Sequence, residues 1–577
     1  MKISGSQVVI ECLVEQGVDT VFGYPGGSIL NIYDALYKNS DRINHILTAH
    51  EQAAAHAADG YARSTGKVGV CMATSGPGAT NLVTGIATAY MDSIPMVAIT
   101  CNVPNNLLGK DTFQEIDITG VTMPITKHNF MVRDVNDLAK TIREAFEIAR
   151  SGRPGPVLVD ILKDVTAAEI EFEPLPKSDN NSEFIIETHK NLKRVMNVSE
   201  PTDEEIKIIA DVINNAKRPI IYAGGGIKIS GAEKELLEFA EKSQIPVSES
   251  LMARDCFPAT HPLCTWMVGM HGTKASNMGI TESDLVIALG ARFSDRVIGD
   301  PDKFASGAKV LHIDIDPAEI NKNIQTSNSL IGDIKSILSR IIPLIEVVDR
   351  KDWNDKIQGW KKEIPSTYNV EKPNSINPKF ICETINKIAG EDTFITTEVG
   401  QNQMWTAQFY PFTKPRTFVT SGGLGTMGFG TGAAIGIQCA LPKARVVHIA
   451  GDGSFRMNCN ELATIQHYNL PIVIVIENNG ALGNVRMWQR LFYGKRFSQT
   501  TLDFGPDWCK LADAYGIQSW KANNSKEFEK VFAEAFNSGK PAIIDARVDI
   551  DEMVLPMVPG GKPVYAQIME LSKEMMD

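Results

Sequence analysis

Apolar runs of strand length alternate with longer, helix-like segments along nearly all of this 577-residue chain. In its N-terminal part the runs are VGVCMAT, PMVAITC and PGPVLVDIL, and a longer amphipathic or small-residue segment precedes each of them. Strands that are buried on both faces of a parallel sheet have continuous apolar sequences, and parallel strands need a crossover of helix length between them. The pattern therefore predicts the α/β class, with parallel sheets covered by helices.

The alternation is interrupted twice by polar, charged stretches, KSDNNSEFIIETHKNLKRVMNVSEPTDEE and VVDRKDWNDKIQGWKKEIPSTYNVEKPNS. A chain of this length is also too long for one hydrophobic core. We therefore predict three parallel-sheet α/β domains. The predicted bounds are an N-terminal domain over 1–175, a linker over 176–200, a central domain over 201–345, a second linker over 346–376, and a C-terminal domain with a C-terminal arm over 377–577.

Composition argues against several classes of protein. Hydrophobic residues make up 43% of the chain and charged residues 22%, and no run of roughly 18 apolar residues is long enough to span a bilayer. The nine cysteines include no C-x-x-C pair, so neither a zinc ribbon nor a disulfide framework is indicated. A formal net charge of -12 makes nucleic acid a poor candidate partner. Because the first residues lack a signal-peptide pattern, we expect a cytoplasmic protein.

The first and third domains share one order of sequence features. In each, a helix-like segment rich in small residues (AAAHAADGYAR or TGAAIGIQCA) is followed by a buried strand and then by a glycine loop, SGPG or GDGS. This repeat predicts two related folds that contribute to a shared task.

The loop GDGS places Asp452 directly after the apolar run that ends at Ala450. A helix-like segment and the run PIVIVIE follow, and then come Asn478 and Asn479. Neighbouring parallel strands end at one edge of a sheet, so Asp452 and Asn479 would lie side by side with converging oxygen ligands. This combination favours Mg²⁺ bridging a diphosphate, whereas a GDG loop alone is more often an ordinary turn.

A competing pattern lies just before that loop. Gly423, Gly425 and Gly428 match the G-x-G-x-x-G fingerprint and predict a nicotinamide-dependent dehydrogenase in which Asp452 binds the ribose. However, the segment before these glycines, RTFVTSG, is short and polar where the fingerprint needs a clear strand. This alternative also gives the asparagine pair no role.

Glu51 has two interpretations. With Thr48 it forms the S/T-x-x-E pattern of a helix capping box, which requires no function. In its alanine-rich surroundings it would also suit a poorly solvated carboxyl group that donates a proton.

A series of motifs resembles the thiamine-diphosphate-dependent enzymes and, among them, the acetohydroxyacid synthase (acetolactate synthase) family of catalytic subunits. In chain order the motifs are HEQAAAHAADGYAR, TSGPGATN, DTFQE, RPGPVLVDI, GMHGT, ARFSDRV, TEVGQNQMW, GGLGTMGFG and GDGSF with NNGALGNVRMWQ. The resemblance covers nearly the whole chain. It implies a pyrimidine-binding N-terminal domain, a central FAD-binding domain and a C-terminal domain that binds diphosphate and magnesium.

The resemblance also implies an activity and partners. The activity would be that of a carboligase, which decarboxylates pyruvate and joins the remaining two-carbon unit to a second 2-keto acid, pyruvate or 2-ketobutyrate, in branched-chain amino acid biosynthesis. The implied cofactors are thiamine diphosphate, Mg²⁺ and FAD. The implied partners are a second copy of the chain, in a dimer or tetramer with active sites at the subunit interface, and a small regulatory subunit.

The family's cofactor positions carry over to this sequence residue by residue. Asp452, Asn479 and the backbone carbonyl of Ala481 would bind Mg²⁺, and Met427 would support the bent shape of the cofactor. The positions that would contact thiamine diphosphate are Pro77, Asn81, Val399, Gly400, Gln401, Asn402, Gly425, Met427, Asp452, Gly453, Ser454, Asn479, Ala481, Leu482 and Gly483. Those that would contact FAD are Arg153, Gly224, Gly225, Gly226, Met270, His271, Arg292, Asp295, Asp314, Ile315 and Asp333.

Catalytic and substrate positions follow from the same resemblance. Glu51 of the other subunit would hydrogen-bond the pyrimidine ring, and Gln114 and Lys163 are further catalytic positions. Arg296 would pair with the carboxylate of the acceptor, and Trp488 would select its alkyl group. The acceptor-site positions are Phe113, Met270, Arg296 and Trp488. Taken singly, each of these residues is more often an ordinary packing or surface residue.

Four positions depart from the family pattern. Ala49, Ser294, Asn402 and Asn484 replace the common Arg, Asp, His and Met. Asn402 can still donate a hydrogen bond to a phosphate. Three alternatives stay open: a flavin-free catabolic acetolactate synthase or a pyruvate oxidase, a non-catalytic paralogue, and the nicotinamide dehydrogenase.

Overall fold

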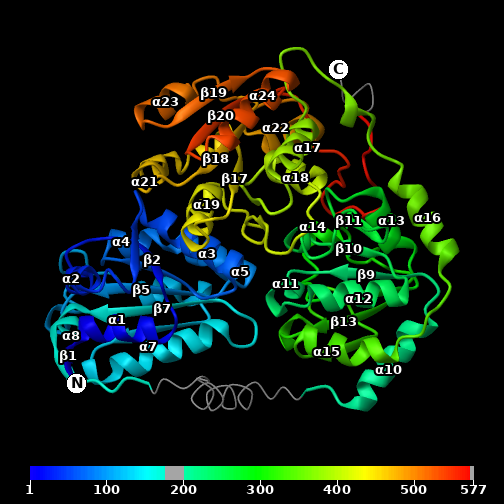
Figure 1. The fold of residues 1–577 in the computed structure, drawn as a ribbon. Helices are drawn as coiled ribbons and strands as arrows, with labels where there is room; N and C mark the ends of the chain where they lie inside the picture. Colours follow the sequence, from blue (N-terminus) through cyan, green and yellow to red (C-terminus); the bar gives the residue numbers. More distant parts are fainter. Residues whose placement is uncertain (176–199, 572–577) are drawn as a thin grey trace.

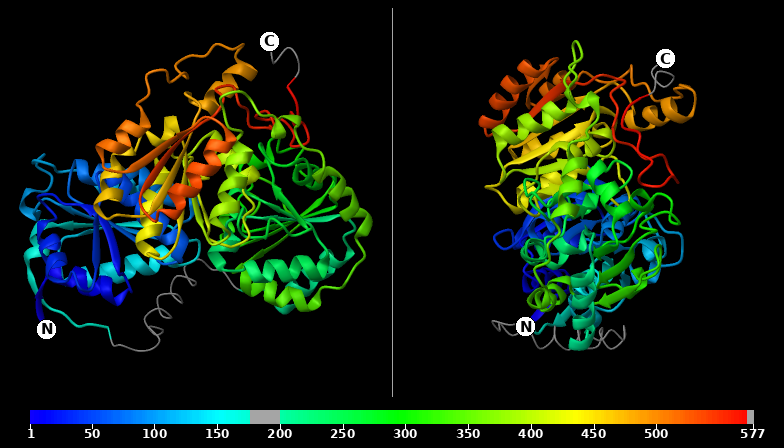
Figure 2. Two further views of the ribbon diagram at one scale, coloured as in Figure 1. Left: turned by 45° about the horizontal axis from the view of Figure 1, so that its top comes forward. Right: turned by 90° about the vertical axis from the view of Figure 1, so that its right-hand side faces the viewer.

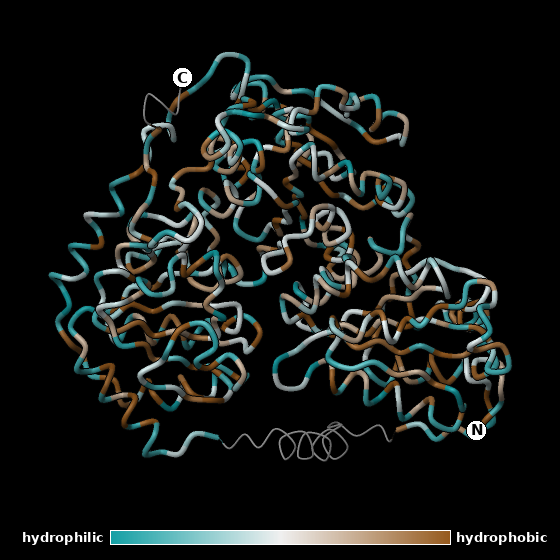
Figure 3. The backbone as a smooth tube through the Cα atoms, turned by 180° about the vertical axis from the view of Figure 1, so that it is seen from behind, coloured by the Kyte–Doolittle hydropathy of each residue, from teal (hydrophilic) through white to brown (hydrophobic). Residues whose placement is uncertain are grey.

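Three six-stranded parallel sheets form the framework of the computed structural model (Figure 1, Figure 2). The structure describes residues 1–175 and 200–571. The predicted linker over 176–200 therefore lies outside the described residues except for its last position. Figure 3 shows hydrophobic stretches of the chain running through the interior of the domains.

The N-terminal sheet has the strand order β3-β2-β4-β5-β7-β6. Its strands are β2 (Thr20–Tyr24), β3 (Asn44–Leu47), β4 (Gly69–Ala73), β5 (Met96–Asn102), β6 (His128–Val132) and β7 (Pro156–Leu162); β1 (Lys2–Ser4) and β8 (Glu169–Glu171) form a separate antiparallel pair. The helices are α1 (Gly5–Glu15), α2 (Leu30–Lys38), α3 (Glu51–Thr65), α4 (Pro77–Asn81), α5 (Val83–Asp92), α6 (Ile118–Thr122), α7 (Val135–Arg150) and α8 (Lys163–Ala167). Helices α1, α2 and α7 cover one face of the sheet, and α3 and α5 cover the other.

The C-terminal sheet has the strand order β16-β15-β17-β18-β20-β19. Its strands are β15 (Phe394–Thr397), β16 (Phe418–Val419), β17 (Val446–Gly451), β18 (Ile472–Asn478), β19 (Gln518–Ala522) and β20 (Ala542–Arg547). Its helices are α17 (Pro378–Ala389), α18 (Gln401–Phe409), α19 (Phe429–Ala440), α20 (Asp452–Phe455), α21 (Leu462–His467), α22 (Gly483–Phe492), α23 (Trp508–Ala514) and α24 (Ser525–Asn537). When the strands of each sheet are numbered in chain order, this topology is identical to that of the N-terminal sheet, so the predicted repeat is a repeat of fold.

The central sheet has a different order, β11-β10-β9-β12-β13-β14. Its strands are β9 (Pro219–Ala223), β10 (Val247–Glu249), β11 (Cys264–Met267), β12 (Leu285–Leu289), β13 (Lys309–Asp314) and β14 (Asn328–Ile331), and its helices are α10 (Asp203–Asn215), α11 (Gly226–Ser230), α12 (Glu233–Ser243), α13 (Lys274–Glu282), α14 (Asp295–Ile298) and α15 (Ile334–Ile341). The order of the strands reverses between β9 and β12. Open α/β sheets bind ligands at such a switch point, beyond the carboxyl ends of the strands.

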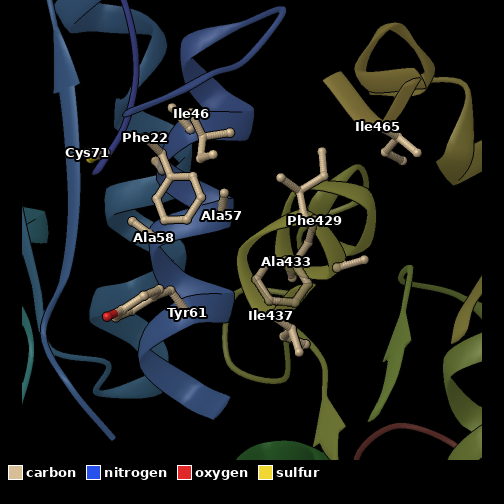
Figure 4. Close-up of a cluster of buried hydrophobic side chains, with 14 of the residues drawn as sticks. Phe22, Ile46, Ala57, Ala58, Tyr61, Cys71, Phe429, Ala433, Ile437 and Ile465 are labelled. Carbon is tan, nitrogen blue, oxygen red and sulfur yellow. The ribbon is translucent and has the colours of Figure 1, made fainter. Parts of the chain in front are cut away.

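Helices α3 and α19 cross closely and join the N-terminal and C-terminal domains through one hydrophobic cluster. Figure 4 shows Ala57 of α3 on the side of Phe429 and Ala433 of α19, while Ala58 and Tyr61 point to the side of Phe22. The crossing depends on glycine, because a Cβ atom added at position 436 would lie 1.9 Å from the carbonyl oxygen of Ala57.

The second predicted linker contains a packed helix, α16 (Lys351–Lys361). Its Trp353 and Ile357 are buried against Ala275 of α13. The charged composition of this segment concealed two apolar side chains four positions apart, a spacing that places them on one helical face. Among the described helices, none combines the length and the apolar character that a membrane crossing requires.

Candidate active site

The carboxyl edge of the C-terminal sheet contains a small cavity of about 90 Å³. Strands β17 and β18 are parallel neighbours, with Gly451 opposite Glu477, so Asp452 and Asn479 follow adjacent strand ends. Most of the predicted thiamine diphosphate positions line this cavity: Val399, Gly400, Gln401, Asn402, Met427, Asp452, Gly453, Ser454, Asn479, Ala481, Leu482 and Gly483.

Asp452 is buried without a full set of hydrogen bonds. Its side chain is 6% exposed, and Oδ1 has no hydrogen-bond partner among the described residues. Burial raises the pKa of the Asp452 carboxyl to about 6. An unpaired buried carboxylate is unfavourable, and a bound cation would remove that cost.

The amide of Asn479 is held in one orientation. Its Nδ2 donates to Oε1 of Gln401 at 3.0 Å, and its Oδ1 accepts from the backbone N–H of Ala481 at 3.1 Å. Gln401 is in turn fixed because its Nε2 donates to the carbonyl of Glu552 at 2.8 Å. The second lone pair of Asn479 Oδ1 is thereby left for a further partner.

The Asn402 side chain is hydrogen-bonded within the protein. Its Nδ2 donates to the backbone carbonyls of Glu398 (3.2 Å) and Ile449 (2.9 Å), so both amide hydrogens are already used. A hydrogen bond from Asn402 to a phosphate would require one of these hydrogens to change partner, so that contact stays a prediction. In this structure the side chain ties α18 to β17.

The segment with the dinucleotide fingerprint lacks the geometry of a dinucleotide site. The strand before its glycines, β16, has two residues and lies at the edge of the sheet. The first turn of α19, where such a site binds a pyrophosphate, is occupied by the carboxylate of Glu398, which accepts from the backbone N–H groups of Gly428, Gly430 and Thr431. Glu398 was not predicted from the sequence, because its only signal there is that of an acidic residue directly after a strand.

A second, much larger cavity of about 1200 Å³ is lined by all three domains. It reaches the switch point of the central sheet, where the glycine triplet follows β9. All of the predicted FAD positions line it: Arg153, Gly224, Gly225, Gly226, Met270, His271, Arg292, Asp295, Asp314, Ile315 and Asp333. Gly224 lies so close to the neighbouring loop that an added Cβ atom would be 2.0 Å from the carbonyl oxygen of Gly290.

Two predicted substrate residues meet at the wall of this larger cavity. The guanidinium carbon of Arg296 lies 5.5 Å from the ring centroid of Trp488, within range of a cation–π interaction. Trp488 Nε1 has no hydrogen-bond partner among the described residues. Met270 is fixed nearby, because its backbone N–H donates to the carbonyl of Arg296 at 2.8 Å.

Of the remaining predicted residues, Gly425 lines the larger cavity and the others belong to the N-terminal domain. Glu51 begins α3 and accepts a hydrogen bond from Asn81 at 3.0 Å, while Gln114 packs against Gly76. The lining residues of the two described cavities do not include Glu51, Pro77, Asn81, Phe113, Gln114 or Lys163. The predicted catalytic positions Glu51, Gln114 and Lys163 therefore lie apart from the two cavities of a single chain.

The capping-box interpretation of Glu51 is wrong. The N-cap of α3 is His50, whose side chain accepts from the backbone N–H of Gln52, and the Thr48 hydroxyl donates to the carbonyl of His50. Since Glu51 is not used for capping, its carboxylate is available for other contacts.

Comparison with known proteins gives three family matches in chain order. Residues 3–121 match the N-terminal TPP binding domain of thiamine pyrophosphate enzymes, residues 206–341 match the central domain, and residues 398–546 match the C-terminal TPP binding domain.

Similar full-length proteins give a narrower result. A probable acetolactate synthase large subunit of Methanocaldococcus jannaschii is 49% identical over 571 residues, which cover 97% of this chain and 94% of that protein. An acetolactate synthase large subunit of Corynebacterium glutamicum is 45% identical over 570 residues, covering 97% and 89%. The corresponding protein of Buchnera aphidicola is 44% identical over 567 residues, covering 97% of each. On these matches, the chain belongs to the acetolactate synthase family of thiamine pyrophosphate enzymes.

Proposed function

We propose that this chain is the catalytic subunit of a carboligase that makes 2-acetolactate from two molecules of pyruvate, or 2-aceto-2-hydroxybutyrate from pyruvate and 2-ketobutyrate. The observation that carries the proposal is the unpaired Oδ1 of Asp452, which belongs to a cavity lined by most of the predicted cofactor positions. Similarity to acetolactate synthases over 97% of the chain supports the same activity.

Asp452, Asn479 and the backbone carbonyl of Ala481 would hold Mg²⁺. The fit is supported by the unpaired carboxylate oxygen and by the fixed amide of Asn479. Mg²⁺ prefers oxygen ligands and often combines a few protein groups with phosphate oxygens. Bound thiamine diphosphate would supply the electron sink for decarboxylation of a 2-keto acid.

The large cavity would hold FAD. Its volume of about 1200 Å³ exceeds the range of roughly 300–1,000 Å³ that is usual for small-molecule pockets. A glycine triplet at the switch point allows close approach by a phosphate-bearing ligand. Both features support a dinucleotide as the occupant.

The chain's own residues would bind and orient the second 2-keto acid. The Arg296 guanidinium would pair with the substrate carboxylate, and the adjacent Trp488 ring would contact its alkyl group. The cavity wall would also exclude water from the reacting carbon.

Two copies of the chain would be needed for a complete site. Glu51 and Asn81 lie outside both cavities of the single chain, and Phe113 of the same domain is 88% exposed. We propose that this group faces the magnesium cavity of a second copy in a dimer or tetramer. The name "large subunit" of the relatives supports a further small-subunit partner, which co-purification from native extract would detect.

Incubation of the purified protein with pyruvate, Mg²⁺ and FAD, with and without thiamine diphosphate, tests this function. We expect 2-acetolactate only with thiamine diphosphate, at one product per two pyruvates consumed, without oxygen consumption. Loss of pyruvate without acetolactate would refute carboligation. Bound flavin is detected separately by absorbance near ~450 nm in the purified protein.

A further inference from the structure

We infer that Glu398 is a positioning residue: its buried carboxylate fixes three segments of the thiamine diphosphate cavity relative to one another. The inference rests on the proposed function, because it concerns the same cavity. Glu398 immediately precedes Val399 and Gly400, which line that cavity, but it is not itself among the lining residues.

Four hydrogen bonds converge on this carboxylate. Oε2 accepts from the Ser454 hydroxyl at 2.6 Å and from the Gly428 N–H at 2.7 Å. Oε1 accepts from the N–H groups of Gly430 at 3.0 Å and Thr431 at 3.3 Å. One side chain thereby connects the loop after β17, the turn that contains Met427, and its own strand end.

The charge of Glu398 fits its surroundings. The N–H groups of the first turn of α19 are donors without partners inside the helix, and a negative charge there interacts favourably with the helix dipole. His448 Nε2 also lies 3.5 Å from Oε1. Burial by itself raises the pKa of the Glu398 carboxyl, but the contacts with His448, Ser454 and Gly428 outweigh burial and lower it.

The conformation of the Met427 turn shows why an anchor is needed. Gly428 has φ of +88° and ends the turn, and Gly425 has φ of +70° at its start. Glycine is flexible in the absence of restraints, so a turn with two such residues has high conformational entropy when free. The carboxylate restrains Gly428 directly and therefore the position of Met427 beside it.

Substitution of Glu398 separates this role from general stability. In Glu398→Gln, one acceptor oxygen is replaced by an NH₂ group that opposes the donors of Ser454 and α19. We expect the dissociation constant for thiamine diphosphate with saturating Mg²⁺, measured by titration calorimetry, to rise at least about tenfold, the effect of losing about 1.4 kcal/mol. Glu398→Asp, which keeps the charge but shortens the side chain, should give an intermediate value.

Glu15→Gln is the control, because the Glu15 carboxylate is 12% exposed and likewise accepts from several donors, Arg143 and the Leu175 N–H, far from the cavity. It should lower the melting temperature without changing thiamine diphosphate affinity. Wild-type affinity in folded Glu398→Gln overturns the inference; if that variant does not fold, wild-type affinity in Glu398→Asp does so. Failure of the wild-type chain to bind thiamine diphosphate would instead refute the proposed function.

Discussion

Asn479 donates a hydrogen bond from Nδ2 to Oε1 of Gln401, with 3.0 Å between the two atoms. The bond determines which end of the Asn479 amide is directed to its other partner, the N–H of Ala481. In Gln401→Met, which has a similar length but no acceptor, Asn479 can rotate and lose its ligand orientation. We expect about tenfold weaker binding of Mg²⁺, measured as the Mg²⁺ concentration needed for thiamine diphosphate to raise the melting temperature.

Gln438→Met is the matched control for this prediction. Gln438 is also buried. Its Nε2 donates to the carbonyls of Leu441, Pro442 and Ala444, which follow the C-terminal end of α19, whereas the cavity lies at the N-terminal end of that helix. This variant should lose stability without a change in Mg²⁺ dependence. Equal Mg²⁺ dependence in both variants would contradict an orienting role for Gln401.

Asp452→Asn should separate stability from cofactor binding. The unpaired, buried Oδ1 is unfavourable in the protein without metal, so a neutral amide should stabilise that form by about 1–2 kcal/mol. The same variant should lose the rise in melting temperature that Mg²⁺ and thiamine diphosphate cause in the wild type. Thermal unfolding with and without both ligands measures the two effects together. A retained ligand-dependent rise would contradict a need for the Asp452 charge in metal binding.

The strands that could be predicted from the sequence are those inside the sheets. The apolar runs identified β4, β5 and β7 in the first domain, and β17 and β18 in the third. The strands that were missed are mainly at sheet edges, such as β3, β6, β16 and β19. The edge strands β3, β6 and β19 are partly exposed and lack a continuous apolar sequence, whereas β16 is buried but has only two residues.

The candidate site shows a similar limit. The spacing of Asp452 and Asn479 predicted their position at adjacent strand ends, because parallel neighbours end at one edge. Glu398 could not be predicted, since three of its four donors are backbone N–H groups about thirty positions away, which leave no residue-type signal. Hydrogen bonds to the backbone depend on the fold and not on the identity of the partner residue.

Gly436→Ala should destabilise the crossing of α3 and α19. The new Cβ would lie 1.9 Å from the backbone oxygen of Ala57, so the two helices must separate, at a cost of about 1–3 kcal/mol. Gly359→Ala provides the opposite case, because no atom lies within 4 Å of the added Cβ and alanine favours a helix by up to about 1 kcal/mol. Melting temperatures should therefore move in opposite directions. A parallel change would argue against close packing at the crossing.

The pH dependence of stability should include a contribution from Asp160. This buried carboxyl accepts from Thr100 and Asn102, but burial is the larger influence and raises its pKa from 3.8 to about 6. The folded state binds this proton more tightly than the unfolded state. Protonation of Asp160 therefore contributes fully to the free energy of unfolding below pH 3.8. This contribution, about 3 kcal/mol, is lost as the pH rises through 6. The difference in melting temperature between Asp160→Asn and wild type should grow in favour of the variant over this interval. A difference independent of pH would contradict the raised pKa.

Mixed dimers test whether Glu51 serves the magnesium site of another copy. Glu51→Gln should slow turnover at least about 100-fold, the usual range for a proton-transfer group, and Asp452→Ala should be inactive without bound metal. When the two inactive variants are co-expressed, about half of the dimers are hybrids. If sites form between subunits, each hybrid has one site in which both Glu51 and Asp452 are intact. Acetolactate formation should then recover to about a quarter of the wild-type rate. If each site forms within one chain, every site in a hybrid carries one substitution, and co-expression should restore no activity.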